Sequence, residues 1–162
     1  MIAANIEGVI NEQIKLEMDS SQIYLAMAAY FHAVGLDGMA QWMKAQSREE
    51  TGHAMKFFDH LVDRGGRVEL SGLTQPRKEW GSVMEAFEDA YRHEQFITSK
   101  IHQLYKLTLD EADYAANGML QWFVTEQVEE EASVSKIVEN LKRIGNSGSG
   151  LIMLDHQLGK RA

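Results

Sequence analysis

A spacing of polar residues that fits one turn of helix occurs twice in this chain. The first copy is Glu50-x-x-His53, and the second copy, 77 residues later, is Gln127-x-x-Glu130. Residues three positions apart on a helix point to the same side, about one turn apart. In the first copy this places a carboxylate and an imidazole where one metal ion could bind both. The repeat favours a fold in which two similar helical segments face each other.

A further glutamate precedes each copy at the same distance. Glu17 lies 33 residues before Glu50, and Glu94 lies 33 residues before Gln127. Apolar residues recur around these positions at helical intervals, so each is expected on the buried face of a helix. We therefore predict two helical hairpins that place their polar residues at equivalent heights in a bundle.

The apolar periodicity predicts four long helices and a short fifth one. The long helices are expected over about residues 5–34, 38–64, 81–109 and 112–144, and the short one over about 149–158. The chain has a single proline, which favours long uninterrupted helices because proline breaks helix interiors. We expect one all-α domain over residues 1–162, with a four-helix bundle over about 5–144.

Residues 65–80 are expected to connect the second and third helices without a helical period of their own. They contain Gly65, Gly66, Gly72 and Pro76. A fully extended segment of this length reaches roughly 53 Å, whereas the second helix would be about 40 Å long. The connection can therefore run the full length of the bundle, which would make the third helix parallel to the second.

Composition limits the classes of partner. The formal net charge of −8 argues against nucleic acid as the main partner and suits a protein that attracts cations. The absence of cysteine excludes disulfides, iron–sulfur clusters and thiol chemistry. No apolar run approaches the ~20 residues of a membrane span, and the first residues show no secretion signal. We expect a cytoplasmic protein without a membrane partner.

Four carboxylates are expected on buried helix faces, namely Glu17, Glu50, Glu94 and Glu130. Burying one unpaired carboxylate costs several kcal/mol or forces it to be protonated. Two divalent cations at the centre of the bundle would remove this cost, and carboxylates with an imidazole suit iron or manganese. The Glu50-x-x-His53 spacing alone is common on helices and would also fit salt-bridged or surface residues. The shared offsets of the whole set favour a metal site.

With these residues the chain resembles a known family, the bacterial non-haem ferritins. The resemblance runs from Ile6 to about Leu158 and rests on Leu16-Glu17, Tyr24, Glu49-Glu50-x-x-His53, Gly65-Gly66-Arg67, Glu94 and the block from Leu120 to Glu131. It implies a ferritin-like four-helix bundle with one long crossover and a short fifth C-terminal helix. It also implies that identical subunits assemble into a hollow twenty-four-subunit cage.

The resemblance also implies which residues bind iron. One iron site would use Glu17, Glu50 and His53. The other would use Glu50, Glu94 and Glu130, so that Glu50 bridges the two irons.

Further roles are implied for residues around this di-iron centre. Gln127 would act beside the ligands, and Tyr24 would serve as a hydrogen-bond or electron donor, although a packed core tyrosine would look the same in sequence. Glu49, Glu126 and Glu129 resemble a third iron site on the inner side of the bundle. Three glutamates run consecutively from Glu129 and cannot share one helix face, so some of these acids could equally be solvated.

The resemblance implies iron storage. Fe(II) would be oxidised by O₂ or H₂O₂ at the di-iron ferroxidase centre, and ferric oxyhydroxide would mineralise inside the cage. Haem is not expected. The related bacterioferritins bind haem through a methionine just before the first-site histidine, and Gly52 stands at that position here.

The sequence leaves two other functions open. A rubrerythrin-like di-iron peroxidase or oxidoreductase would use similar ligands without storing mineral, although the cysteine-rich domain usual in such enzymes is absent. A cage or scaffold could also bind metal without turnover. The size of the particle and its response to aerobic Fe(II) would separate these possibilities.

Overall fold

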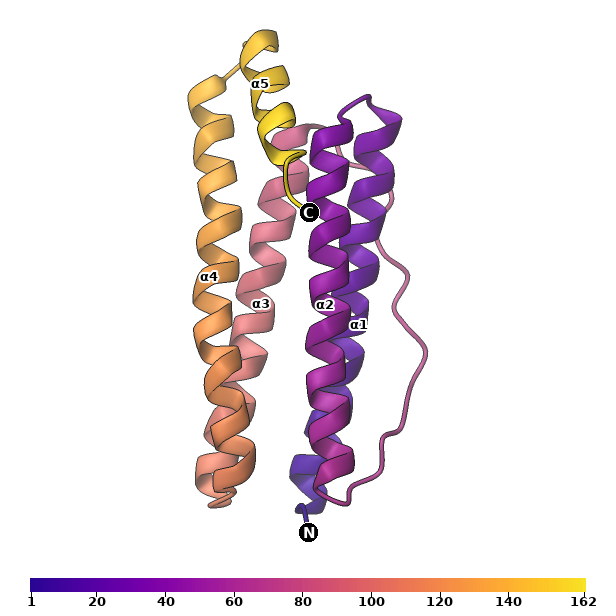
Figure 1. Cartoon of the computed structure of the whole chain (residues 1–162), viewed down its shortest axis with the longest axis vertical. Helices are drawn as coiled ribbons and strands as arrows, with labels where there is room; N and C mark the ends of the chain where they lie inside the picture. Colours follow the sequence, from indigo (N-terminus) through magenta and orange to yellow (C-terminus); the bar gives the residue numbers. More distant parts are fainter.

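The computed structural model describes all 162 residues and contains helices without any strand. Its elements are α1 (Ala4–Ala33), α2 (Asp37–Asp63), α3 (Val83–Asp110), α4 (Tyr114–Ile144) and α5 (Gly148–Leu158). The four long helices lie side by side along the longest axis, and α5 folds back at one end of the bundle (Figure 1). The predicted all-α bundle is confirmed, and every predicted boundary lies within two residues of the observed one. None of the helices is long and apolar enough to cross a membrane.

Short turns make α1 and α2 one antiparallel hairpin and α3 and α4 another. Gly35, the second residue after α1, adopts φ +78°, a conformation that glycine takes without steric cost and that ends a helix. Asp113 caps α4 by accepting a hydrogen bond from the backbone N–H of Ala116. The Arg64 guanidinium also binds the Asp113 carboxylate, at 2.8 Å, and so connects the end of α2 with the start of α4.

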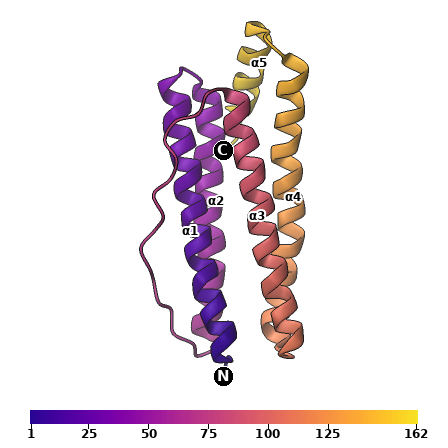
Figure 2. The same cartoon turned by 180° about the vertical axis from the view of Figure 1, so that it is seen from behind.

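The crossover from α2 to α3 follows the outer side of α1 from one end of the bundle to the other (Figures 1 and 2). Asn11 of α1 accepts a hydrogen bond from the backbone N–H of Glu69, and Asp19 accepts one from that of Thr74. Polar side chains of α1 thus satisfy backbone groups of the crossover, which has no regular structure of its own. As predicted, α3 is parallel to α2.

The hydrophobic core is divided into two clusters. One contains Phe31, Met43 and Phe87 near the α5 end of the bundle. The other contains Ile10 and Phe57, nearer the end where the chain begins. Burying each such side chain contributes about 1.5–3 kcal/mol. The polar residues singled out in the sequence lie along the helices between the two clusters, so the site occupies a layer across the middle of the core.

Candidate metal centre

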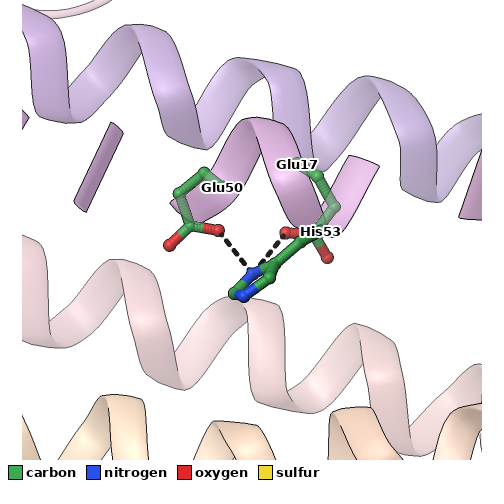
Figure 3. A group of neighbouring side chains, drawn as sticks. All are labelled: Glu17, Glu50 and His53. Carbon is green, nitrogen blue, oxygen red and sulfur yellow. Dashed lines mark hydrogen bonds and ion pairs between the residues drawn. The ribbon is translucent and has the colours of Figure 1, made fainter. Parts of the chain in front are cut away.

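The first hairpin brings together Glu17 of α1 with Glu50 and His53 of α2. His53 Nδ1 lies 3.1 Å from Glu50 Oε2 and 3.8 Å from Glu17 Oε2. Both carboxylates point toward the imidazole (Figure 3). One ligand atom from each residue lies within 4.8 Å of the others, and all three side chains are buried. The three side chains are thus close enough for one cation to bind all of them.

A second group joins the two hairpins. Glu50 of α2, Glu94 of α3 and Glu130 of α4 offer carboxylate oxygens within 4.8 Å of one another, and all three are buried. Glu50 belongs to both groups. Its carboxylate is therefore placed where it could bridge two cations.

A third three-ligand group combines residues that the sequence does not assign to one site. His53, Glu126 and Glu130 also offer ligand atoms within 4.8 Å of one another, and His53 Nε2 lies 3.9 Å from Glu126 Oε1. The residues expected to form a third iron site, Glu49, Glu126 and Glu129, line one cavity without forming such a three-ligand group. Glu126 thus links the centre to that cavity.

Two glutamine side chains that the sequence reasoning did not assign to the site hold the carboxylates in place. Gln13 Nε2 lies 2.8 Å from Glu17 Oε1. Gln46 Nε2 lies 3.1 Å from Glu50 Oε1 and 2.6 Å from Glu130 Oε2. In α1 and in α2 the glutamine precedes the glutamate of the same helix by four residues, a spacing that puts the two side chains on one face. That spacing is the signal that could have identified them.

Tyr24 and Gln127 both contact Glu94. The Tyr24 hydroxyl donates a hydrogen bond to Glu94 Oε1, and Gln127 Nε2 lies 3.2 Å from Glu94 Oε2. Gln127 also donates to Thr98 Oγ1, at 3.1 Å. The structure therefore places both where they orient a carboxylate, and Tyr24 is at the same time a fully buried core residue.

Burial makes most of these carboxylates hold their protons when no cation is bound. It raises the pKa of Glu94 to about 8, with a further contribution from the charge of Glu50. Burial, together with the charges of Glu50 and Glu94, also raises the pKa of Glu130 to about 8. The pKa of Glu17 lies well above its usual range, first because of burial and then because of Glu50. The centre therefore stores protons that a cation would displace.

Glu50 and His53 behave in the opposite way. Burial alone would raise the pKa of Glu50, but the hydrogen bond and charge of His53, together with hydrogen bonds from Gln46 and Glu17, outweigh burial and lower it. Burial alone would lower the pKa of His53, but the hydrogen bond and charge of Glu50, together with the carboxyl groups of Glu130 and Glu126, outweigh burial and raise it. The two residues form an ion pair that favours the charged form of the carboxylate that both three-ligand groups share.

Two buried carboxylate oxygens in the centre have no hydrogen-bond partner, namely Glu17 Oε2 and Glu130 Oε1. Leaving a buried polar atom unsatisfied costs about 1–3 kcal/mol, more for a charged group. Glu17 and Glu130 come from opposite hairpins, and each is a member of a three-ligand group. Cations bound between the hairpins would satisfy both, so the donor set fits hard divalent metal ions such as Fe²⁺.

Residues 8–144 match a family model described as the ferritin-like domain of ferritin. The chain is 40% identical over 161 residues to the bacterial non-heme ferritin of Bacteroides fragilis, covering 99% of this chain and 100% of the relative. This chain belongs to the ferritin family. It is also 38% identical over 159 residues to a probable bacterial non-heme ferritin-like protein of Haemophilus influenzae, covering 98% of this chain and 96% of that one.

Solved ferritin structures show the same fold. The open pore ferritin of the hyperthermophilic archaeon Archaeoglobus fulgidus superposes with a TM-score of 0.99 at 44% sequence identity, with all of both chains covered. A closed form of that ferritin, engineered by site-directed mutagenesis, gives the same TM-score and covers 99% of the solved chain. The ferritin-like bundle predicted from the sequence, with its long crossover and short fifth helix, is confirmed.

Proposed function

We propose that this ferritin stores iron by oxidising Fe(II) at an intrasubunit di-iron ferroxidase centre and depositing ferric oxyhydroxide inside a multi-subunit cage. The observation that carries this proposal is the pair of overlapping three-ligand groups that share Glu50 between the hairpins. One iron would bind Glu17, Glu50 and His53. The other would bind Glu50, Glu94 and Glu130.

The residues of the centre suit a substrate that arrives as Fe(II) and leaves as Fe(III). Binding of Fe(II) displaces the protons held by Glu94 and Glu130, which then carry the negative charge that favours the higher oxidation state. Gln46 and Gln127 keep the carboxylates oriented through their amide hydrogen bonds. The two irons supply the electrons that reduce O₂ or H₂O₂.

The oxidised iron would leave through the cavity lined by Glu49, Glu126 and Glu129. Glu130 lines this cavity and also belongs to the di-iron centre, so it provides a ligand on both sides of the path. We propose that these acids bind a third iron in transit. Looser, partly exposed carboxylates suit passage better than permanent retention.

The assembly is proposed from the ferritin relatives. Ferritins are multi-subunit proteins, and this chain is expected to self-associate with closed symmetry, as a cage of twenty-four subunits. No nucleic acid or membrane partner is proposed, and the cytoplasmic location stays a prediction. We also propose that no haem is bound, since the exposed Gly52 offers no thioether ligand beside His53.

Aerobic addition of Fe(II) followed by gel filtration with iron detection tests this function. The wild-type protein should elute as a very large particle that carries ferric iron. Glu50→Ala and His53→Ala should slow iron oxidation strongly, whereas Glu12→Ala, which removes an exposed carboxylate from α1, should not. Unchanged oxidation in both centre variants would show that the site is assigned wrongly.

The same experiment separates the alternative functions. A small particle that reduces peroxide and retains no iron would instead indicate a rubrerythrin-like peroxidase. A large particle that binds Fe(II) without oxidising it would indicate a scaffold without turnover.

A further inference from the structure

The end of the chain folds back onto the bundle after α5. The backbone N–H of Arg161 donates to the carbonyl oxygen of Leu158, at 3.3 Å, and Gln41 Nε2 donates to the carbonyl oxygen of Arg161, also at 3.3 Å. The Arg161 guanidinium lies over the Trp42 ring, 4.6 Å from its centroid. Arginine binds flat aromatic faces in this way, which fixes its side chain.

The guanidinium of Arg161 contacts a carboxylate of the cavity lined by Glu49, Glu126 and Glu129. Arg161 Nη2 lies 2.8 Å from Glu49 Oε2, and the Arg161 side chain is only 25% exposed. Glu49 is one of the residues proposed above to bind a third iron. The positively charged guanidinium of Arg161 therefore already contacts a carboxylate to which an iron in transit would have to bind.

The cavity itself is small and strongly acidic. It has a volume of about 290 Å³, and its charged lining residues are Glu49, Glu126, Glu129, Glu130 and Arg161. Arg161 is the only cationic residue among them. Glu130 is 4% exposed, and its Oε1 atom has no hydrogen-bond partner. The cavity thus combines an unsatisfied buried acceptor with a guanidinium that neutralises part of its charge.

We propose that Arg161 competes with a third metal cation for Glu49, so that the C-terminal tail weakens cation binding in this cavity of the subunit. Two like charges in a space of this size repel each other, and Glu49 Oε2 cannot contact the guanidinium and a metal ion at full strength together. The tail would thus keep the third site weak and favour release of iron toward the mineral. This inference rests on the proposed function, which supplies iron to the cavity from the di-iron centre.

Titration of the assembled, metal-free protein with Zn²⁺ by calorimetry tests the proposal without any redox reaction. The wild type should show two tight sites per subunit and a weaker third site. Arg161→Gln should tighten the third site by roughly fivefold, the scale of a partly exposed ion pair. Lys160→Gln is the matched control, because it removes the same charge one residue earlier from a side chain that does not line the cavity.

A second variant separates competition for Glu49 from a general change of charge. Adding Glu49→Gln to Arg161→Gln should abolish the gain in third-site affinity. Equal third-site affinities in the wild type and Arg161→Gln would overturn the role of Arg161, and so would a gain that persists without the Glu49 carboxylate. Absence of the two tight sites from the wild type would instead overturn the proposed di-iron centre.

Discussion

Gln46 Nε2 lies 2.6 Å from Glu130 Oε2, in a contact that joins α2 of one hairpin to α4 of the other. The same amide donates to Glu50 Oε1, at 3.1 Å. Since Oε2 of Glu130 is occupied in this way, its other oxygen, Oε1, is the one left without a partner. A neutral amide therefore sets which oxygen of Glu130 is free for a cation.

Gln46→Leu should weaken metal binding at the second iron site by roughly tenfold, the lower end of the effect expected when a partner that orients a metal ligand is removed. Both carboxylates lose a donor to their charged forms, so the loss should be greater at low pH than at pH 8. Zn²⁺ calorimetry would measure it. Gln103→Leu, at an exposed position of α3, is the control. Equal affinities for the two variants would show that the amide does not orient the ligands.

The metal-free protein should lose stability as pH rises from about 5 to 8. The folded-state pKa values of Glu94 and Glu130 are raised to about 8, whereas the unfolded values lie near 4.5. Between these two pKa values the folded state binds more protons than the unfolded state. The protonated carboxyls therefore stabilise the folded state below about pH 4.5, and this stabilisation is lost as pH rises through about 8. We expect a decrease on the order of a few kcal/mol per subunit in the free energy of unfolding.

Thermal unfolding of chelator-treated protein across this pH range would measure the decrease. Glu94→Gln carries no titrating proton at that position and should flatten the profile. The stability of Zn²⁺-loaded protein should not decrease over this pH range, because the metal takes the place of the protons. Loading at pH 7 should release protons into a weakly buffered solution, and a titration without proton release would contradict the raised pKa values.

Tyr24→Phe should slow single-turnover oxidation of Fe(II) by roughly threefold to tenfold, with the number of bound Fe(II) ions unchanged. The Tyr24 hydroxyl donates to Glu94 and lowers the pKa of that carboxyl, so its loss makes Glu94 harder to deprotonate. The defect should therefore shrink above pH 8. Tyr91→Phe, on α3 and only partly buried, is the control. A defect independent of pH would favour electron donation by Tyr24 over positioning of Glu94.

Gly38→Ala should loosen α5. A Cβ atom at Gly38 would collide with the backbone carbonyl of Asp155, and the same Asp155 caps α2 by accepting a hydrogen bond from the backbone N–H of Met39, at 2.7 Å. Overpacking of this kind costs about 1–3 kcal/mol. Amide hydrogen exchange should rise in α5 and the tail. Gly8→Ala, with open space around it on α1, should leave α5 unchanged and slightly stabilise the protein.

The positions of the candidate ligands in the bundle could be predicted from the sequence because each depends on a helical period that a long helix preserves. Glu17 and Glu50 fall on buried stripes of α1 and α2, and the equal offsets fix their height relative to Glu94. Helix boundaries followed from glycines such as Gly35 for the same local reason. The course of the crossover followed from its length alone.

Contacts that depend on side-chain conformation or on long-range packing could not be predicted. The contact of Gln46 with Glu130 joins residues 84 positions apart, and no spacing within a helix encodes it. The contact of Arg161 with Glu49 requires α5 to fold back against α2, which the apolar character of residues 151–158 does not specify. The third group around His53 likewise depends on how Glu126 turns toward the imidazole.

The two hairpins are joined covalently only by the crossover, which lies on the outer side of α1 (Figure 2). Between them, the layer of acids interrupts the apolar core. A cation bound by Glu50 from one hairpin and by Glu94 and Glu130 from the other would cross-link the two halves of the subunit. A bound iron would then hold the two hairpins together, and its departure would let them move relative to each other. Opening motions between the hairpins would thus be largest in the empty subunit, the state that must admit the next iron.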